Sequence, residues 1–154
     1  MRENDWKLEE QAGHVFRLPA AIASRYSRLP VSLVNFLSGL MSCADSSQTS
    51  WFLCQSDFEG TSNSAFRWDE WEHLSLEAAN GDTKLITEIR AFWNCHFPFL
   101  ISVNSGYAFH AVCTAEDRFG QIVEGHEPEF EEVSLVADSF ENFLSEFINV
   151  NRTA

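Results

Sequence analysis

The sequence of 154 residues lacks the short motifs that mark the common enzyme classes. It contains no glycine-rich phosphate loop, no H-E-x-x-H, no G-x-S-x-G and no zinc-ligand spacing, so we predict no catalytic residues, no cofactor and no metal site. It also lacks a C-x-x-C pair, because its four cysteines are widely separated among apolar residues: Cys43, Cys54, Cys95 and Cys113. Buried, reduced thiols are favoured over metal ligands, with one disulfide left open as an alternative.

Long apolar runs are missing as well. No stretch approaches the roughly 18 uninterrupted apolar residues of a membrane span, and residues 1–6 lack the apolar core of a signal peptide. These two absences predict a soluble protein of the cytoplasm with no membrane partner.

Basic residues are few, and the acidic ones are unevenly placed. The formal net charge is −13; the segment 116–146 holds ten acidic residues and one basic residue, a net charge of −9, which leaves −4 for the rest of the chain. A field of this sign repels nucleic acid and anionic lipid and attracts a basic partner. The alternative is that the acidic surface only maintains solubility.

What the chain has in quantity is apolar and aromatic side chains, at 45% and 14% of the residues. A chain of this length buries about 68–70% of its unfolded surface, enough for a core without disulfides or metals. There is no internal repeat. We therefore predict a single domain over residues 1–154, in which residues 1–17 form an N-terminal extension or helix.

The most regular pattern lies between residues 97 and 113. Apolar residues alternate with other residues on both sides of Asn104, Ser105 and Gly106, and glycine accepts the positive φ of a tight turn, so the pattern predicts a β-hairpin. Further strands are expected at 51–54, 120–124 and 130–137. Helices are expected over Glu3–Ala12, 19–29, 30–41 and 66–74, from Asp82 onward, and after Asp138, which is expected to cap the closing helix.

This order of elements predicts the α+β class, with an antiparallel sheet of about four to six strands covered by helices. On the closing helix, a stripe of large apolar residues is expected to anchor it to the sheet: Phe140, Phe143, Leu144, Phe147 and Ile148.

A few histidines and cysteines have neighbours that suggest chemistry. Cys95 and His96 resemble a nucleophile and its base, but adjacent residues in a strand point apart, so a structural role is favoured. His110 is expected to face solvent or to have a partner within the fold. Glu72 and His73 lack a second histidine at metal-ligand spacing and are expected on the surface.

The carboxylates after residue 116 form the predicted partner-binding site. A strip from His126 to Glu132 lacks the oxygen spacing and glycine of a calcium loop, so a solvated or partner-facing strip is favoured over a cation site. Strand alternation would place Glu129 and Glu131 on one face and Glu132 on the other. The residues proposed to contact a partner are Asp117, Glu124, Glu127, Glu129 and Glu131. The alternative surface is the pair of polar loops at 45–50 and 60–64.

Several of these segments together resemble the SUKH superfamily. The resemblance covers residues 29–148 and rests on the following segments: Leu29-Pro30 opening a helix that contains Phe36-Leu37, Pro98-Phe99 entering a hairpin, the strand 120–123, and the run Val136-Ala137-Asp138-Ser139-Phe140-Glu141-Asn142-Phe143-Leu144. The superfamily includes bacterial immunity proteins and the yeast cell-wall assembly regulator.

The resemblance implies an α+β fold and, for bacterial members, neutralisation of a cognate toxin by direct binding, often a nuclease or another enzyme that acts on nucleic acid. It carries over no catalytic residue. The first functional hypothesis is therefore a non-enzymatic immunity protein that binds a basic toxin domain. The alternatives are a regulatory or scaffold module of the same fold and a small enzyme.

Overall fold

The computed structural model describes residues 5–152, and over this range the chain forms seven strands, six α-helices and one short 3-10 helix. The strands are β1 Trp6–Glu10, β2 Leu40–Asp45, β3 Ser50–Phe52, β4 His96–Ser102, β5 Ala108–Cys113, β6 Ile122–His126 and β7 Ser134–Ala137. The helices are α1 Ala20–Arg25, α2 Val31–Leu37, α3 Gln55–Glu59, α4 Glu70–Ala78, α5 Thr83–Asn94 and α6 Phe140–Arg152, with the 3-10 helix η1 Glu116–Arg118.

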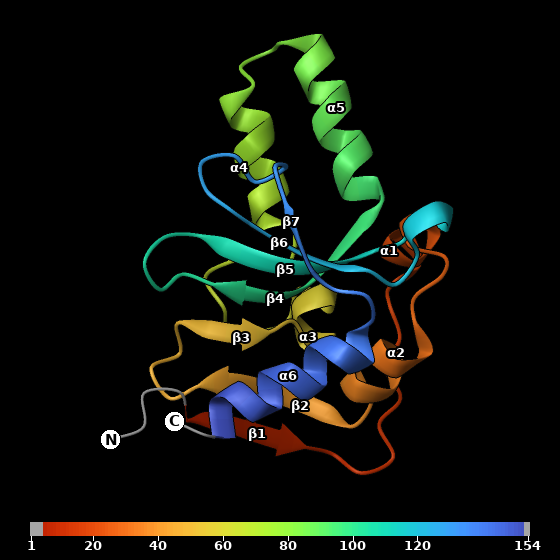
Figure 1. Cartoon of the computed structure of the whole chain (residues 1–154), viewed down its shortest axis with the longest axis vertical. Helices are drawn as coiled ribbons and strands as arrows, with labels where there is room; N and C mark the ends of the chain where they lie inside the picture. The colour runs from red at the N-terminus through yellow and green to blue at the C-terminus, as the bar shows by residue number, and fades with distance from the viewer. Residues whose placement is uncertain (1–4, 153–154) are drawn as a thin grey trace.

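All seven strands belong to one antiparallel sheet in which each strand pairs with the next along the chain, in the order β1-β2-β3-β4-β5-β6-β7. The predicted α+β class with an antiparallel sheet is thus confirmed. The described residues contain one strand more than the upper predicted number of six. The sequential order places β1 at one edge of the sheet and β7 at the other (Figure 1).

Helices cover both faces of the sheet. The face that carries Phe99 and His110 receives α6, whose Phe143 ring centre lies 5.3 Å from that of Phe99 and 5.1 Å from that of His110. The opposite face carries Phe109, which contacts Trp93 of α5 at 4.8 Å between ring centres. In Figure 1 α6 crosses the front of the sheet over its β1 end, whereas α4 and α5 form a helical hairpin that projects beyond its other end.

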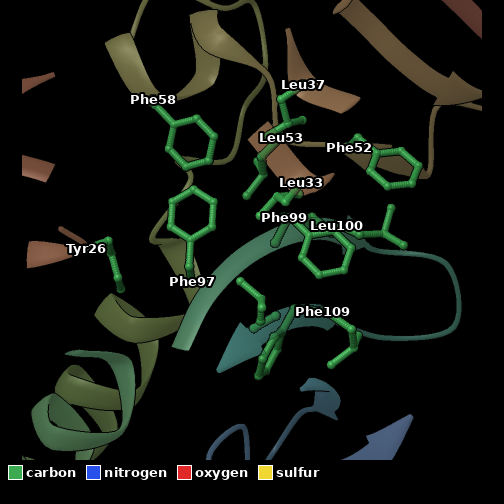
Figure 2. Close-up of a cluster of buried hydrophobic side chains, with 14 of the residues drawn as sticks. Tyr26, Leu33, Leu37, Phe52, Leu53, Phe58, Phe97, Phe99, Leu100 and Phe109 are labelled. Atoms are coloured by element: carbon green, nitrogen blue, oxygen red, sulfur yellow. The ribbon is translucent and has the colours of Figure 1, made fainter. Parts of the chain in front are cut away.

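Aromatic rings fill the interior, as the composition predicts. Figure 2 shows Phe58 of α3 facing Phe97 of β4, and these rings stack with their centres 5.1 Å apart. On the α6 side, Phe52 stacks on Phe99 at 6.2 Å. Stacked and tilted rings of this kind add to the stabilisation from burial itself. The core therefore runs through the middle strands, β3 to β5, and ties both helical layers to them.

The N-terminal third of the chain differs from the prediction. Residues 6–10 form the edge strand β1, not a helix, because Trp6 and Leu8 alternate with charged residues and find a partner in β2. Glu3 and Asn4 of the predicted helix lie outside the described residues. The predicted helix 30–41 ends at Leu37, since Gly39 adopts a φ of +82°, and Leu40 then begins β2.

From residue 82 onward most elements follow the prediction, whereas α3 is not among the predicted elements and the helix expected over 66–74 begins at Glu70. The hairpin of β4 and β5 turns through Ser105 and Gly106, both with positive φ. The α5 helix is capped by Asp82, as predicted, because the Asp82 side chain accepts a hydrogen bond from the Leu85 N–H. The closing helix α6 is capped one residue later than predicted, because the Ser139 hydroxyl accepts the Asn142 N–H while Asp138 remains exposed.

One predicted strand is shorter in the structure than expected. The strand expected over 130–137 includes only Ser134–Ala137, so residues 127–133 form a loop. Within residues 5–152, none of the helices combines the length and the apolarity that crossing a membrane requires.

Candidate functional site

A groove with acidic walls separates the α4–α5 helical hairpin from the loop 127–133. Its volume is about 380 Å³. The floor is apolar, with Ala79 and Ile89 buried at its base and Leu85 exposed at its edge. The walls carry four carboxylates, Glu88 from α5 and three from the loop: Glu129, Glu131 and Glu132.

The loop is held against the helices by the aromatic ring of Phe130. This ring is buried and lies parallel to Trp71 of α4, with 5.4 Å between the ring centres. The close approach depends on Gly125, because a Cβ at that position would lie 2.7 Å from both the Phe109 ring and the Phe130 carbonyl oxygen. Chain segments that approach this closely leave no room for a side chain. Gly125 therefore determines where the acidic wall stands.

Two of the loop carboxylates are fixed by hydrogen bonds. The indole N–H of the buried Trp93 donates to Glu131 Oε2 at 2.7 Å. The backbone N–H of Tyr107 donates to Glu127 Oε2 at 2.8 Å, and the Glu127 N–H donates in return to the Tyr107 carbonyl oxygen. Hydrogen bonds to a charged acceptor are stronger than neutral ones. The exposed Glu127 and the half-buried Glu131 thus position the loop, and Glu129 and Glu132 are exposed as well.

The structure brings together only part of the predicted partner-binding set. Glu129 and Glu131 line the groove, and Glu127 lies beside it at the start of the loop. Glu124 lies on the opposite face of the sheet, where its Oε1 is 3.4 Å from Nε2 of His110. Asp117 lies in η1, at the other end of β6 from Glu127. The length of β6, roughly 16 Å for five residues, separates these two ends.

Two members of the groove lie outside the predicted set. Strand alternation predicts that Glu132 points away from its neighbours, but the loop conformation places it on the same wall as Glu129 and Glu131. Glu88 lies 41 residues before Glu129, on α5, and no local pattern links it to the loop. Its position next to Ile89, on a helix with a predicted apolar stripe, is the one signal that the sequence offers.

The histidines and cysteines form no catalytic arrangement with one another in the part of the chain that the structure describes. His96 is 3% exposed, its Nδ1 lies 2.7 Å from the Phe92 carbonyl oxygen, and burial lowers its pKa. Burial also lowers the pKa of His110, an effect that the neighbouring Glu124 opposes. The four cysteines are free thiols, and burial raises the pKa of Cys43 to about 11 and that of Cys54 to about 12.

One expectation about this group is wrong. The sequence predicts Glu72 on the surface, but Glu72 is buried and accepts a hydrogen bond at 2.7 Å from the Arg25 guanidinium of α1. Burial disfavours the charged form of Arg25, yet the hydrogen bond to Glu72 and the charge of Glu72 leave the Arg25 pKa raised. The pair joins α1 to α4 and thus has a structural role. Nε2 of His73, the next residue, lies 3.0 Å from Oδ2 of Asp69, the residue that precedes α4.

The two polar loops of the alternative surface do meet. A second hollow of about 380 Å³ lies between them, with Gln48 on one side, Asn63 and Ser64 on the other, and Trp51 and Phe66 between. Its lining residues include no cluster of like charges. Among residues 5–152, no three or more histidine, cysteine, aspartate or glutamate side chains are placed to hold a metal ion.

Comparison of the chain with protein-family models, with curated proteins and with solved structures gives no match. A function for the protein must therefore be inferred from its own residues and their geometry, among which the acidic groove is the most distinctive feature.

Proposed function

We propose that the protein is a cytoplasmic, non-enzymatic immunity protein that binds a basic toxin domain in its acidic groove and so keeps the toxin inactive. The observation that carries the proposal is the combination of an apolar floor with carboxylates on both walls. The sequence resemblance to the SUKH superfamily, whose bacterial members neutralise toxins by direct binding, supports the same function.

The geometry of the groove suits lysine and arginine side chains. Their aliphatic stems bury favourably against apolar surface while the charged head stays near polar groups. Here the stem would lie on Ile89 and Leu85, and the head would reach Glu88 on one wall or Glu129 and Glu132 on the other. A toxin that acts on nucleic acid carries such basic side chains where it binds phosphates. Occupation of the groove would therefore cover the toxin's own substrate-binding surface.

The charge of this region also predicts how binding begins. Opposite charges accelerate encounter, and this attraction weakens as the screening length falls to about 8 Å at physiological salt. We expect the association rate to fall steeply with ionic strength and the dissociation rate to change little.

The test first asks whether a neighbouring gene encodes a toxin domain, and then measures the binding kinetics of that domain over a range of salt concentrations. The triple variant Glu88→Gln, Glu129→Gln, Glu132→Gln should associate at least about tenfold more slowly at low salt and show a flatter salt dependence. A control triple of the same charge change, Glu116→Gln, Glu141→Gln, Glu146→Gln, alters exposed carboxylates away from the groove. Equal kinetics for the two triples would contradict the proposal.

A second measurement separates a binding protein from an enzyme. Replacement of the partly exposed His73 and Cys95 by alanine should leave toxin neutralisation intact, because neither residue lines the groove. Loss of neutralisation in a correctly folded His73→Ala or Cys95→Ala variant would favour catalysis instead.

A further inference from the structure

The edge strand β1 has one side without a partner strand among the described residues. On its inner side the Asp5 carbonyl oxygen accepts the Ser46 N–H at 2.8 Å, and β1 then pairs residue by residue with β2. Backbone groups alternate along a strand, so residues 7 and 9 share the inward direction of Asp5. The N–H and C=O groups of Trp6, Leu8 and Glu10 consequently point outward, along the open edge.

The side chains of this edge are unusual for a surface strand. Leu8 is 51% exposed and lines an apolar groove of about 310 Å³ between β1 and α6. Phe52 and Phe147 form the base of this groove, and Ile148 of α6, 41% exposed, stands beside it. The Trp6 indole closes one end, where its N–H donates to Asn151 Oδ1 at 3.1 Å. An apolar groove beside an open strand edge is a docking surface.

The sequence of β1 is complementary to itself when a second copy runs antiparallel. If the two strands are centred on Leu8, then Lys7 of each copy lies opposite Glu9 of the other, which gives two cross-strand pairs of opposite charge. In this register Leu8 lies beside Leu8 of the second copy, and Trp6 lies opposite Glu10. The outward N–H and C=O groups at positions 6, 8 and 10 are those that this register pairs.

Both sets of contacts fall on consistent faces. Leu8 and Trp6 point toward α6, so two Leu8 side chains would join the two apolar grooves into one buried strip. Lys7 and Glu9 point to the opposite face, where Glu9 Oε1 already accepts the Ser42 hydroxyl and so is held in place. Opposed residues at such positions have Cα atoms about 4.5 Å apart, close enough for an ion pair.

We propose that β1 is a homodimer interface in which two copies extend their sheets into one antiparallel sheet across a two-fold axis at Leu8. The charge of the acidic groove does not oppose this arrangement strongly. The acidic groove lies by β6 and β7, and six strand spacings of about 4.8 Å place it roughly 29 Å from β1, beyond the screening length of about 8 Å.

The experiment measures the mass of the purified protein in solution, without toxin, from micromolar to millimolar concentration. Wild type is expected to approach twice the monomer mass. Lys7→Glu and Glu9→Lys each place like charges opposite one another at two positions, so each variant alone should dimerise at least about tenfold more weakly.

The mixture of the two variants gives the decisive result. The carboxylate introduced by Lys7→Glu meets the ammonium group introduced by Glu9→Lys, and the native Glu9 of the first variant meets the native Lys7 of the second. An equimolar mixture should therefore regain dimers. The control Lys84→Glu makes the same charge change at an exposed position of α5 and should dimerise like wild type. Circular dichroism confirms that each variant is folded.

Each possible outcome is informative. A wild type that stays monomeric to millimolar concentration overturns the proposal and leaves the edge to a segment of another protein. Unchanged dimers in both charge variants, or a mixture that fails to dimerise, overturn the register. Because no toxin is present, none of these results bears on the acidic groove, and loss of toxin binding does not bear on the dimer.

Discussion

At the β1 end of the sheet, the exposed Leu8 lies beside charged side chains of both signs. At the β6–β7 end, all the charged side chains that line the groove are carboxylates. The first arrangement matches a second copy of itself, and the second repels a copy and attracts a basic molecule. Since the two lie at opposite edges of one sheet, occupation of one leaves the other accessible. We therefore expect dimerisation and toxin binding to be independent, with two toxin domains on each dimer.

The two ends also differ in how they are held together. At the β1 end the contacts are between rings, such as Trp6 with Phe147 at 5.1 Å. At the acidic end, hydrogen bonds from Trp93 and Tyr107 to loop carboxylates hold the loop in addition to the stacking of Phe130 on Trp71. Substitutions can therefore damage one end and spare the other, unless they affect the core that both share.

The largest effect is expected from Phe140→Ala, which affects the shared core. Phe140 is 1% exposed and packs on Phe36 and Phe99, and loss of such a ring typically costs about 3–5 kcal/mol of unfolding free energy. Urea denaturation measures the change. The exposed Asn142→Ala on the same helix should stay within about 0.5 kcal/mol of wild type. Similar stabilities for the two variants would mean that α6 does not anchor the sheet.

A smaller and local effect is expected from Gly125→Ala. The added methyl group would stand 2.7 Å from the Phe109 ring and the Phe130 carbonyl, and overpacking of this kind typically costs about 1–3 kcal/mol. The loop should shift, and toxin binding should weaken while the dimer persists. Parallel loss of both activities would show that the two ends are coupled.

Asp82→Ala is expected to destabilise the first turn of α5, near the acidic groove. Its carboxylate accepts the Leu85 N–H at the start of α5, and loss of such a cap typically costs about 1 kcal/mol. Amide hydrogen exchange should accelerate in the first turn of α5 and remain unchanged in β1. Asp82→Asn, which retains the acceptor oxygen, should restore most of the protection.

The smallest effect concerns pH. Burial lowers the pKa of His96 below its ordinary value of about 6.5, so the unfolded chain binds a proton there more readily than the folded chain. The contribution of neutral His96 to stability is therefore present above pH 6.5 and declines as pH falls through this value. His96→Phe should lose less unfolding free energy than wild type between pH 7.5 and 5.5. An identical pH dependence would contradict the assignment.

The sequence predicted those elements that have a strong local signal. The hairpin of β4 and β5 has long alternation and a glycine at the turn, and α5 has both Asp82 as its cap and a wide apolar stripe. The strand β1 was not predicted because its alternation covers only Trp6 to Glu10, and several of its residues also favour helix. Its partner β2 is defined by Gly39, whose positive φ interrupts an apolar pattern that fits a helix equally well.

For the candidate site, the sequence predicted the acidic character but not which residues come together. The excess of carboxylates after residue 116 indicated an acidic surface, and Glu129 and Glu131 do line the groove. The contribution of Glu88 required knowledge of how α5 packs on the loop, which depends on Phe130 and Trp71 meeting across 59 residues. The structural roles of Glu127 and Glu131 likewise depend on hydrogen-bond donors, Tyr107 and Trp93, that are distant in the chain.

The hydrogen bond from Trp6 to Asn151 joins residues 145 positions apart, in a sheet whose strands otherwise pair with their neighbours in sequence. During synthesis β1 leaves the ribosome before α6, and the strands between them can pair one after another as they emerge. The apolar face of β1 and β2 therefore stays exposed until α6 has been synthesised. During that interval the nascent chain exposes an unpaired strand edge beside uncovered aromatic rings. We therefore expect β1 to be the site of chaperone binding, or of premature association between neighbouring nascent chains on one messenger RNA.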